Sequence, residues 1–134
     1  MSKLQLEVVT PDKKVVSAEV DYVSCPGIEG EFGVMPQHVS MLSGLKIGAL
    51  RYDSDGKHQF VFISGGFADV NNGTMSVLAE SAELAEDIDA ARAQAAKARA
   101  EKRLAERGEK LDVVRAEAAL QRAMVRLNLV AQAR

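Results

Sequence analysis

The chain has few of the residues that build covalent or catalytic frameworks. One cysteine, Cys25, stands alone in 134 residues, so no intramolecular disulfide framework is available. Neither the cysteine nor the two histidines occur at a metal-ligand spacing such as Cys-x-x-Cys or His-Glu-x-x-His. The serines are numerous enough for a Ser/His/Asp set, but no feature singles one out. We therefore expect neither an enzyme nor a metal site.

Long apolar runs are also missing. No run approaches the roughly 20 residues that a membrane-spanning helix requires. The first seven residues, MSKLQLE, lack the apolar core of a signal peptide. All four Phe and both Tyr precede residue 68, so the basic second part of the chain has no aromatic platform for stacking bases. We expect no membrane insertion, no secretion signal and no nucleic-acid partner, and the lone cysteine is compatible with a reducing cytoplasm.

Proline and glycine are concentrated in the first part of the chain. All three prolines and nine of the ten glycines precede residue 84. Residues 1–84 carry six basic and eleven acidic residues, a net charge of −5, whereas residues 85–134 carry eleven basic and eight acidic residues, a net charge of +3. This change predicts two parts with different surfaces, 1–84 and 85–134.

Short alternating segments separated by turn signals fill the first part. Residues 4–9 and 15–24 alternate side chains with a period of two, which predicts strands. The dipeptides at 55–56 (Asp-Gly) and 72–73 (Asn-Gly) are typical of two-residue hairpin turns. Further strands are expected at 39–45, 46–52, 60–63 and 74–79. Strands of this length with regular turns predict an all-β sandwich or barrel.

Two glycine-rich segments interrupt these strands. Residues 26–38, PGIEGEFGVMPQH, predict tight turns with at most a short strand near 31–34. A polar loop on a rigid scaffold is a common place for binding residues, but a surface turn with solvated charges fits the same composition. The pair at 65–66 predicts a bulge or sheet corner, because a strand rather than a helix follows it and no Gly-Lys-Ser/Thr is present.

Alanine, arginine and glutamate dominate residues 86–134, which predicts two helices in an antiparallel hairpin. Asp87 is the expected N-cap of the first helix, Gly108 its C′ residue, and Asp112 the cap of the second helix. The expected apolar stripe of the first helix includes Ile88, Ala91, Ala95 and Ala98. That of the second includes Leu120, Met124, Leu127 and Ala131, with Val113, Val125 and Leu129 beside it. An alanine stripe buries little area, so we expect this hairpin to need another surface or to move.

Charged side chains recur on one face of each expected helix: Asp89, Arg92 and Arg99 on the first, and Arg122 and Arg126 on the second. Several guanidinium groups and a carboxylate suit a nucleotide, because arginine binds phosphate and a carboxylate accepts from an exocyclic amine or a ribose hydroxyl. Solvated helix faces with surface ion pairs explain the same spacing, and spacing alone favours that interpretation.

Long motifs distributed over essentially the whole chain resemble the epsilon subunit family of F-type ATP synthases. In order, they are LEVVTP at 6–11, PGIEGEFGVMPQH at 26–38, SGGF at 64–67, AESAE at 79–83 and IDAARA at 88–93. The resemblance implies an α+β two-part chain, with an N-terminal all-β sandwich followed by a C-terminal antiparallel α-helical hairpin. It also implies a non-catalytic rotor subunit of the central stalk, peripheral on the cytoplasmic face of the cell (inner) membrane, that couples proton translocation to ATP synthesis.

The resemblance also implies partners. In the family, the loop that corresponds to Glu29, Gly30 and Glu31 faces the c-ring, and the segment around the residue that corresponds to His38 approaches the gamma subunit. The hairpin has a compact state and an extended state that reaches the alpha/beta catalytic head and inhibits ATP hydrolysis.

The resemblance implies that ATP is a regulatory ligand and that the protein requires no cofactor. In some bacterial members the compact hairpin binds ATP through an Ile/Leu-Asp-x-x-Arg-Ala motif. Residues at the corresponding positions of this chain are Ile88, Asp89, Arg92 and Ala93, with Glu83, Arg99, Arg122 and Arg126 at further binding positions. A free-standing ATP-sensing protein is the alternative, but such a sensor has no need of the loop at 26–38.

Overall fold

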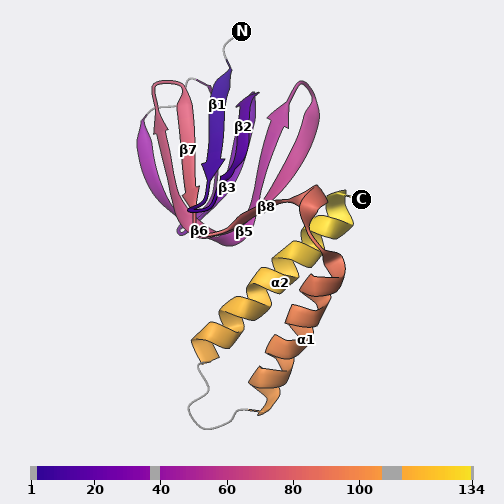
Figure 1. The fold of residues 1–134 in the computed structure, drawn as a ribbon. Helices are drawn as coiled ribbons and strands as arrows, with labels where there is room; N and C mark the ends of the chain where they lie inside the picture. Colours follow the sequence, from indigo (N-terminus) through magenta and orange to yellow (C-terminus); the bar gives the residue numbers. More distant parts are fainter. Residues whose placement is uncertain (1–2, 37–39, 107–112, 134) are drawn as a thin grey trace.

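The structure is a computed structural model that describes residues 3–36, 40–106 and 113–133 (Figure 1). In these residues an N-terminal β-sandwich precedes two C-terminal helices, so the predicted fold class is confirmed. The elements are β1 (Leu4–Val9), β2 (Lys14–Val20), β3 (Tyr22–Gly27), β4 (Gly30–Val34), β5 (Met41–Ser54), β6 (Lys57–Asn71), β7 (Thr74–Ala79), β8 (Ala82–Leu84), the 3-10 helix η1 (Ala85–Asp87), α1 (Ala90–Glu106) and α2 (Val113–Ala133). Neither helix is long and apolar enough, over the residues described, to cross a membrane.

The strands follow the order β2-β1-β7-β6-β5-β3-β4, and β8 pairs with β6. The β1–β7 pair is parallel and the other pairs are antiparallel. The long strand β6 pairs with β8 through residues 61–63 and with β7 from Gly66 onward, so the glycine pair marks the predicted corner. Gly65 and Gly66 have φ values of 101° and 137°, and a Cβ on Gly66 would collide with the carbonyl oxygen of Leu78. Only glycine fits this corner without strain.

Both predicted two-residue turns are confirmed. Asp55 and Gly56 have φ values of 51° and 81° between β5 and β6, and Asn72 and Gly73 have values of 51° and 76° between β6 and β7. Two positive φ angles in a row are characteristic of the type I′ turn, which matches the twist of antiparallel strands. The two segments expected at 39–45 and 46–52 form the single strand β5 over the residues described.

The alternation predicted over residues 15–24 breaks at Asp21. Val16 and Val20 are buried before the break with more exposed residues between them, whereas every residue from Val23 to Gly27 is buried after it, so the alternation is lost. The reason is a change of partner: β2 pairs with β1, but the Asp21 amide donates to the carbonyl of Asp53, and β3 then pairs with β5. Cys25 is a small core residue, and burial raises the pKa of its thiol to about 12.

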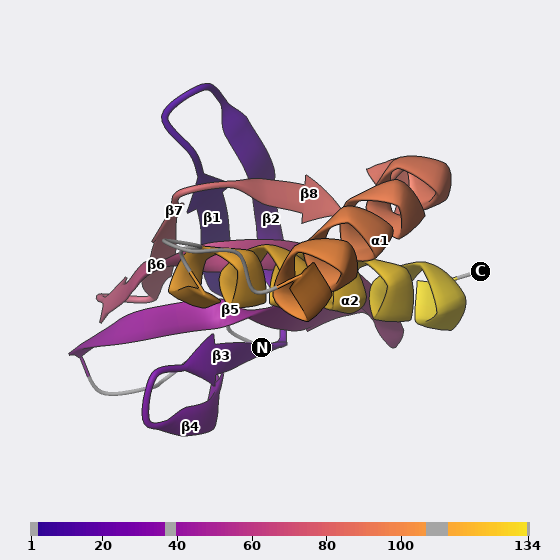
Figure 2. The same ribbon diagram turned by 90° about the horizontal axis from the view of Figure 1, so that it is seen from below.

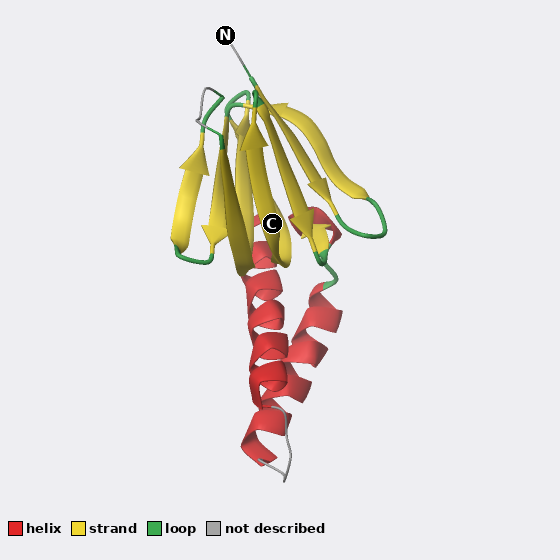
Figure 3. Ribbon diagram, turned by 90° about the vertical axis from the view of Figure 1, so that its left-hand side faces the viewer, coloured by secondary structure: helices red, strands yellow, loops and turns green. Residues whose placement is uncertain are grey.

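The hairpin packs against the outer face of the sandwich through a second apolar cluster. Its buried members are Phe62, Ala85, Ile88 and Leu129. Half-buried side chains from β5, β6 and α2 surround them, namely Ile47, Phe60, Val125 and Val130. Figures 1 and 3 show α1 and α2 running side by side below the sandwich, with the C-terminal end of α2 against β5 and β6. The two helices therefore pack against each other, and the hairpin contacts the strands of the sandwich through α2.

The predicted cap and the predicted alanine stripe of α1 are wrong, and the predicted stripe of α2 is buried only in part. Asp87 lies in η1, and Asp89 is the N-cap of α1, because its Oδ1 accepts from the Arg92 amide at 3.0 Å. The residue before it, Ile88, has extended backbone and so cannot share a helical face with the alanines that follow. Ala91, Ala95 and Ala98 are exposed, and the buried alanines of α1 are Ala93 and Ala100.

On α2 the buried residues are Ala116, Ala123 and Leu129, whereas Met124 and Ala131 are exposed. Leu120 and Leu127 are half-buried. The buried residues of the two helices are therefore mostly alanines. The predicted caps Gly108 and Asp112 lie outside the described residues.

Candidate functional site

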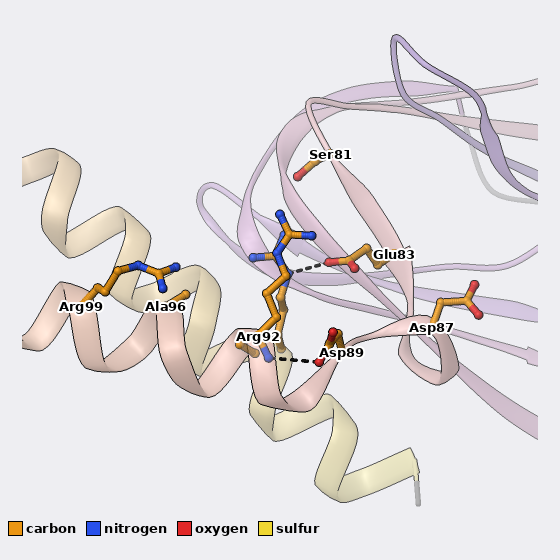
Figure 4. A pocket seen from close by; sticks show the side chains of 9 residues that line it. Ser81, Glu83, Asp87, Asp89, Arg92, Ala96 and Arg99 are labelled. Carbon is orange, nitrogen blue, oxygen red and sulfur yellow. Dashed lines mark hydrogen bonds and ion pairs between the residues drawn. The ribbon is translucent and has the colours of Figure 1, made fainter.

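A cavity of about 450 Å³ lies where α1, α2 and the segment from Ser81 to Asp87 meet (Figure 4). Nine residues line it: Ser81, Glu83, Asp87, Asp89, Arg92, Ala93, Ala96, Arg99 and Arg126. Six of the eight residues selected from the sequence as candidates for ATP binding are among them. Residues that are far apart in the chain thus converge on one polar cavity, as the hypothesis of a nucleotide site requires.

The ion pair of Glu83 and Arg126 spans the cavity from β8 to α2. The Arg126 Nε donates to the Glu83 Oε1 at 2.6 Å, and both side chains are half-buried, with 26% and 35% of their surfaces exposed. The guanidinium group also stacks on Phe62, with its carbon atom 4.1 Å from the ring centroid. Arg126 therefore links α2 to the sandwich through one charge-assisted hydrogen bond and one cation–π contact.

Arg92 and Arg99 line the cavity from α1. They are seven residues apart and so lie on one face of the helix, about 10 Å from each other along its axis. Both guanidinium groups lack a hydrogen-bond or ion-pair partner among the described residues. Figure 4 shows Arg92 close to Glu83 and Asp89, and Arg99 further along α1, away from the sandwich. The cavity thus has two available guanidinium groups along α1, with Arg92 beside the carboxylates and Arg99 at the end farther from the sandwich.

Two of the residues predicted from the sequence to bind ATP do not line the cavity. Ile88 is 2% exposed and belongs to the apolar cluster that holds the hairpin on the sandwich, so its role here is packing. Arg122 is half-buried on α2 and is not among the lining residues. Asp89 does line the cavity, but its Oδ1 already caps α1.

Three lining residues were missed in the sequence: Ser81, Asp87 and Ala96. The Ser81 hydroxyl donates to the Ser64 Oγ at 2.7 Å, and the Ser64 Oγ accepts from the Ser81 amide at 3.0 Å. These two hydrogen bonds hold the start of β8 against β6. The short strand β8 and the 3-10 helix have no periodic pattern in the sequence, and the position of Asp87 predicts a helix cap instead.

The other candidate region is the β3–β4 hairpin. Gly27 pairs with Gly30, so the turn at its tip consists of Ile28 and Glu29, and the strand β4 is longer than the short strand expected. Glu29, Gly30 and Glu31 are exposed, and the Glu31 Oε1 accepts from the Ser24 hydroxyl at 2.5 Å. Figure 2 shows this hairpin projecting from the sandwich, apart from α1. His38 lies outside the described residues.

An exposed apolar patch crosses the neighbouring strands. Leu42, Phe67 and Leu78 are each more than half exposed, and Phe67 pairs directly with Leu78 across β6 and β7. Phe67 is also opposite Gly44 of β5, and the exposed side chain of Ile28 packs over that glycine. We call these residues, Ile28, Leu42, Phe67 and Leu78, the apolar patch. Contiguous exposed apolar side chains of this kind usually mark an interaction surface.

Comparison with known proteins identifies the family. Residues 3–85 match the family described as "ATP synthase, Delta/Epsilon chain, beta-sandwich domain", and residues 86–131 match "ATP synthase, Delta/Epsilon chain, long alpha-helix domain". The chain belongs to the ATP synthase delta/epsilon chain family. Within this family the epsilon chain is a non-catalytic stalk subunit, so the expectation that the chain is not an enzyme is confirmed.

Curated relatives are named ATP synthase epsilon chain. The one from Nitratidesulfovibrio vulgaris (strain DP4) is 61% identical over 103 residues, which cover 77% of each chain. The one from Lawsonia intracellularis is 55% identical over 126 residues, which cover 94% of this chain and 95% of the relative.

A solved structure of the Euglena gracilis mitochondrial ATP synthase, OSCP/F1/c-ring in rotational state 1, contains a chain similar to this one. The TM-score is 0.81 at 26% sequence identity, and the match covers 100% of this chain and 83% of that chain. The delta/epsilon fold of this chain is therefore the fold of a component of an F1/c-ring assembly.

Proposed function

We propose that the chain is a rotor subunit of the central stalk of an F-type ATP synthase, with a C-terminal hairpin that responds to ATP. It binds the gamma subunit and the c-ring, and so helps to couple proton translocation to ATP synthesis at the cytoplasmic face of the inner membrane. In its compact state the hairpin binds ATP, and in an extended state it reaches the alpha/beta catalytic head and inhibits hydrolysis. The observation that carries the ATP part is the convergence of six candidate residues on one cavity.

The charges in the cavity suit a nucleotide in one orientation. Arg92 and Arg99 supply unpaired guanidinium groups for phosphate oxygens. Glu83 and Asp87 supply carboxylates that accept from amine and hydroxyl groups, as the base and the ribose offer. A volume of about 450 Å³ lies within the range of small-molecule sites, roughly 300–1,000 Å³. ATP bound in this way has its phosphates along α1 and its base beside β8 and η1.

Binding at this place favours the compact state. A ligand shifts a two-state equilibrium only by binding one state better, and a ligand that contacts α1, α2 and β8 together requires all three to be docked. Between α1 and α2 the buried residues are mostly alanines, which bury little apolar area. We expect ATP to supply part of the stability that this interface lacks. When ATP is scarce the hairpin is released, and α2 alone, with 21 residues, can reach about 30 Å.

Two surfaces of the sandwich support the rotor role. The apolar patch crosses β5, β6 and β7 beside the segment that follows His38, where the family resemblance expects the gamma subunit. The exposed tip of the β3–β4 hairpin, with Glu29, Gly30 and Glu31, presents carboxylates, which suits the polar loops of a c-ring. A pure ATP sensor needs neither surface, so both favour the rotor over a free-standing sensor.

The ATP part is tested by calorimetric titration of the full chain. Arg99→Gln removes an unpaired cation from the cavity, and we expect it to weaken ATP binding by on the order of tenfold, as for loss of a charged hydrogen bond. Arg103→Gln is the matched control, because Arg103 is exposed on the same helix one turn later and does not line the cavity. Absence of both heat and thermal stabilisation at millimolar ATP would refute ATP binding.

The rotor part is tested separately, by co-purification of the tagged chain with gamma and c-ring subunits from membranes. Leu42→Asp places a charge in the apolar patch, and we expect it to abolish this association. Leu78→Asp tests the far side of the same patch. Recovery of the chain free of any ATP synthase subunit, with ATP binding intact, would favour the free-standing sensor instead.

A further inference from the structure

A second cavity, of about 510 Å³, lies at the joint between the helical hairpin and the sandwich. Residues 57–60 of β6 form one wall, residues 84–86 at the junction of β8 and η1 form another, and Gln132 lines it from the end of α2. Among the described residues, none lines both this cavity and the one between α1, α2 and β8, and α1 does not reach it. The two cavities are therefore separate places on the molecule.

The β6 wall of this cavity is an open sheet edge. β8 pairs with residues 61–63 of β6 and then turns into η1, so residues 57–60 pair with β5 on one side and with no described strand on the other. The backbone groups of an antiparallel strand alternate between its two sides. The carbonyl of Asp53 points toward β3, where it accepts from the Asp21 amide. His58 lies directly opposite Asp53, so its N–H and C=O point the other way, to the open edge.

The side chains around this edge offer one free charge and an apolar surface. Lys57 is exposed, and its ammonium group has no ion pair among the described residues. Phe60 and Leu84 are half-buried and line the cavity from two sides. The Asp53 carboxylate accepts from the Nδ1 of His58 at 2.6 Å, because an ionised carboxylate has no hydrogen to donate. This hydrogen bond holds the imidazole in place at the wall.

We propose that this cavity binds the C-terminal residues of an extended peptide from a partner chain. The peptide backbone exchanges two hydrogen bonds with the open edge at His58, its terminal carboxylate pairs with Lys57, and an apolar terminal side chain packs on Phe60 and Leu84. Addition of a strand to a free sheet edge and capture of a terminal carboxylate are both general modes of peptide recognition. Glu86 on the η1 wall carries a negative charge, so it disfavours acidic side chains in the peptide.

Binding at this place also bears on the hairpin. The wall at Gln132 belongs to α2, so the cavity is complete only while α2 is docked on the sandwich. A ligand that binds the docked state better shifts the equilibrium toward it. The peptide is thus an input to the hairpin that does not depend on nucleotide, and the inference does not rest on the ATP site.

The test is an NMR titration of the 15N-labelled full chain with the peptide acetyl-Ala-Val-Leu. We expect the amide resonance of His58 to shift as the peptide binds. The same peptide with a C-terminal amide should bind on the order of tenfold more weakly, because it lacks the charge that pairs with Lys57. A peptide with N-methylated valine should also bind more weakly, because it has lost a donor for the open edge.

Lys57→Gln identifies the partner of the carboxylate. We expect it to weaken binding of the acid peptide on the order of tenfold and to leave binding of the amide peptide unchanged, since both changes remove the same ion pair. Lys46→Gln is the matched control, because Lys46 is an exposed lysine of β5 that does not line the cavity. Far-UV circular dichroism verifies that each variant is folded. Amide hydrogen exchange at the C-terminal end of α2 should slow when the acid peptide is added.

Four results would overturn the inference. The first is an unchanged His58 resonance at millimolar peptide, and the second is equal binding of the acid and amide peptides. The third is an equal effect of Lys57→Gln and Lys46→Gln. The fourth is binding of sodium hexanoate as tight as that of the peptide, which would mean that the cavity takes any small apolar carboxylate. None of these results depends on whether the chain binds ATP.

Discussion

Leu129→Ala is expected to detach the hairpin from the sandwich without unfolding the sandwich. Leu129 is 2% exposed, and on α2 it is the residue buried in the cluster with Phe62, Ala85 and Ile88. Truncating a buried leucine costs roughly 2–5 kcal/mol, from lost apolar contact and the cavity left behind. The sandwich core is a separate cluster that does not include Leu129, so its packing is untouched. We expect a loss of about 3 kcal/mol, confined to docking of the hairpin.

The assay is native-state hydrogen exchange of the isolated full chain, resolved by mass spectrometry of peptides. A cost of about 3 kcal/mol corresponds to roughly a 150-fold change in the docking equilibrium. The rate of amide hydrogen exchange in the C-terminal half of α2 should rise by up to about that factor. The amides of β1, β6 and β7 should keep their protection. Met124→Ala is the matched control, because Met124 lies on the same helix but is 50% exposed. Equal loss of protection in α2 and the sandwich would refute the argument, since it would mean that the two parts unfold as one unit.

Three further predictions follow from the sandwich. Gly66→Ala should lower the free energy of unfolding, measured by urea denaturation, by at least about 2 kcal/mol, because φ is 137° and the added methyl group meets the Leu78 carbonyl. Gly73→Ala should lower it by less, because Gly73 lies in an open turn. The hydrogen bond from Lys3 lowers the pKa of Asp21 from 3.8, so the stability that this carboxylate contributes is present above pH 4 and is lost as the pH falls through its lowered pKa. Asp21→Asn should therefore flatten the acid limb of a pH–stability curve measured by thermal unfolding, and an unchanged limb would contradict this. The Cys25 thiol, buried and with its pKa raised to about 12, should resist a thiol reagent at pH 8 until the chain unfolds; rapid labelling of the native chain would contradict its burial.

Features that depend on neighbours in sequence were predictable. The turns at 55–56 and 72–73 and the strand β7 are where the local pattern places them, because type I′ turns require residues that tolerate positive φ. The alternation in β1 correctly separates buried Leu4, Leu6 and Val8 from the residues between them, because side chains of a strand point to opposite faces. Of the candidate ATP residues, the motif and the family resemblance supplied six that converge on the cavity.

The face of α1 could not be predicted in the same way. Alanines occur on several sides of this helix, so the spacing of alanines alone does not indicate which of them are buried. The buried face is set by where the helix begins and by what packs on it. Asp89 rather than Asp87 caps the helix, and the contact with α2 then buries Ala93 and Ala100.

The sequence by itself determined the two-part architecture, the turns, most strands and the family, because these depend on local propensity, on periodicity and on motifs along the chain. Tertiary structure alone decided the loss of alternation at Asp21, where the chain leaves its pairing with β1 and begins to pair with β5. It also decided the pairing of Glu83 with Arg126, since these residues are 43 positions apart and meet only when α2 docks on β8. Contacts of that kind depend on how the elements pack, which no periodicity within a single element encodes.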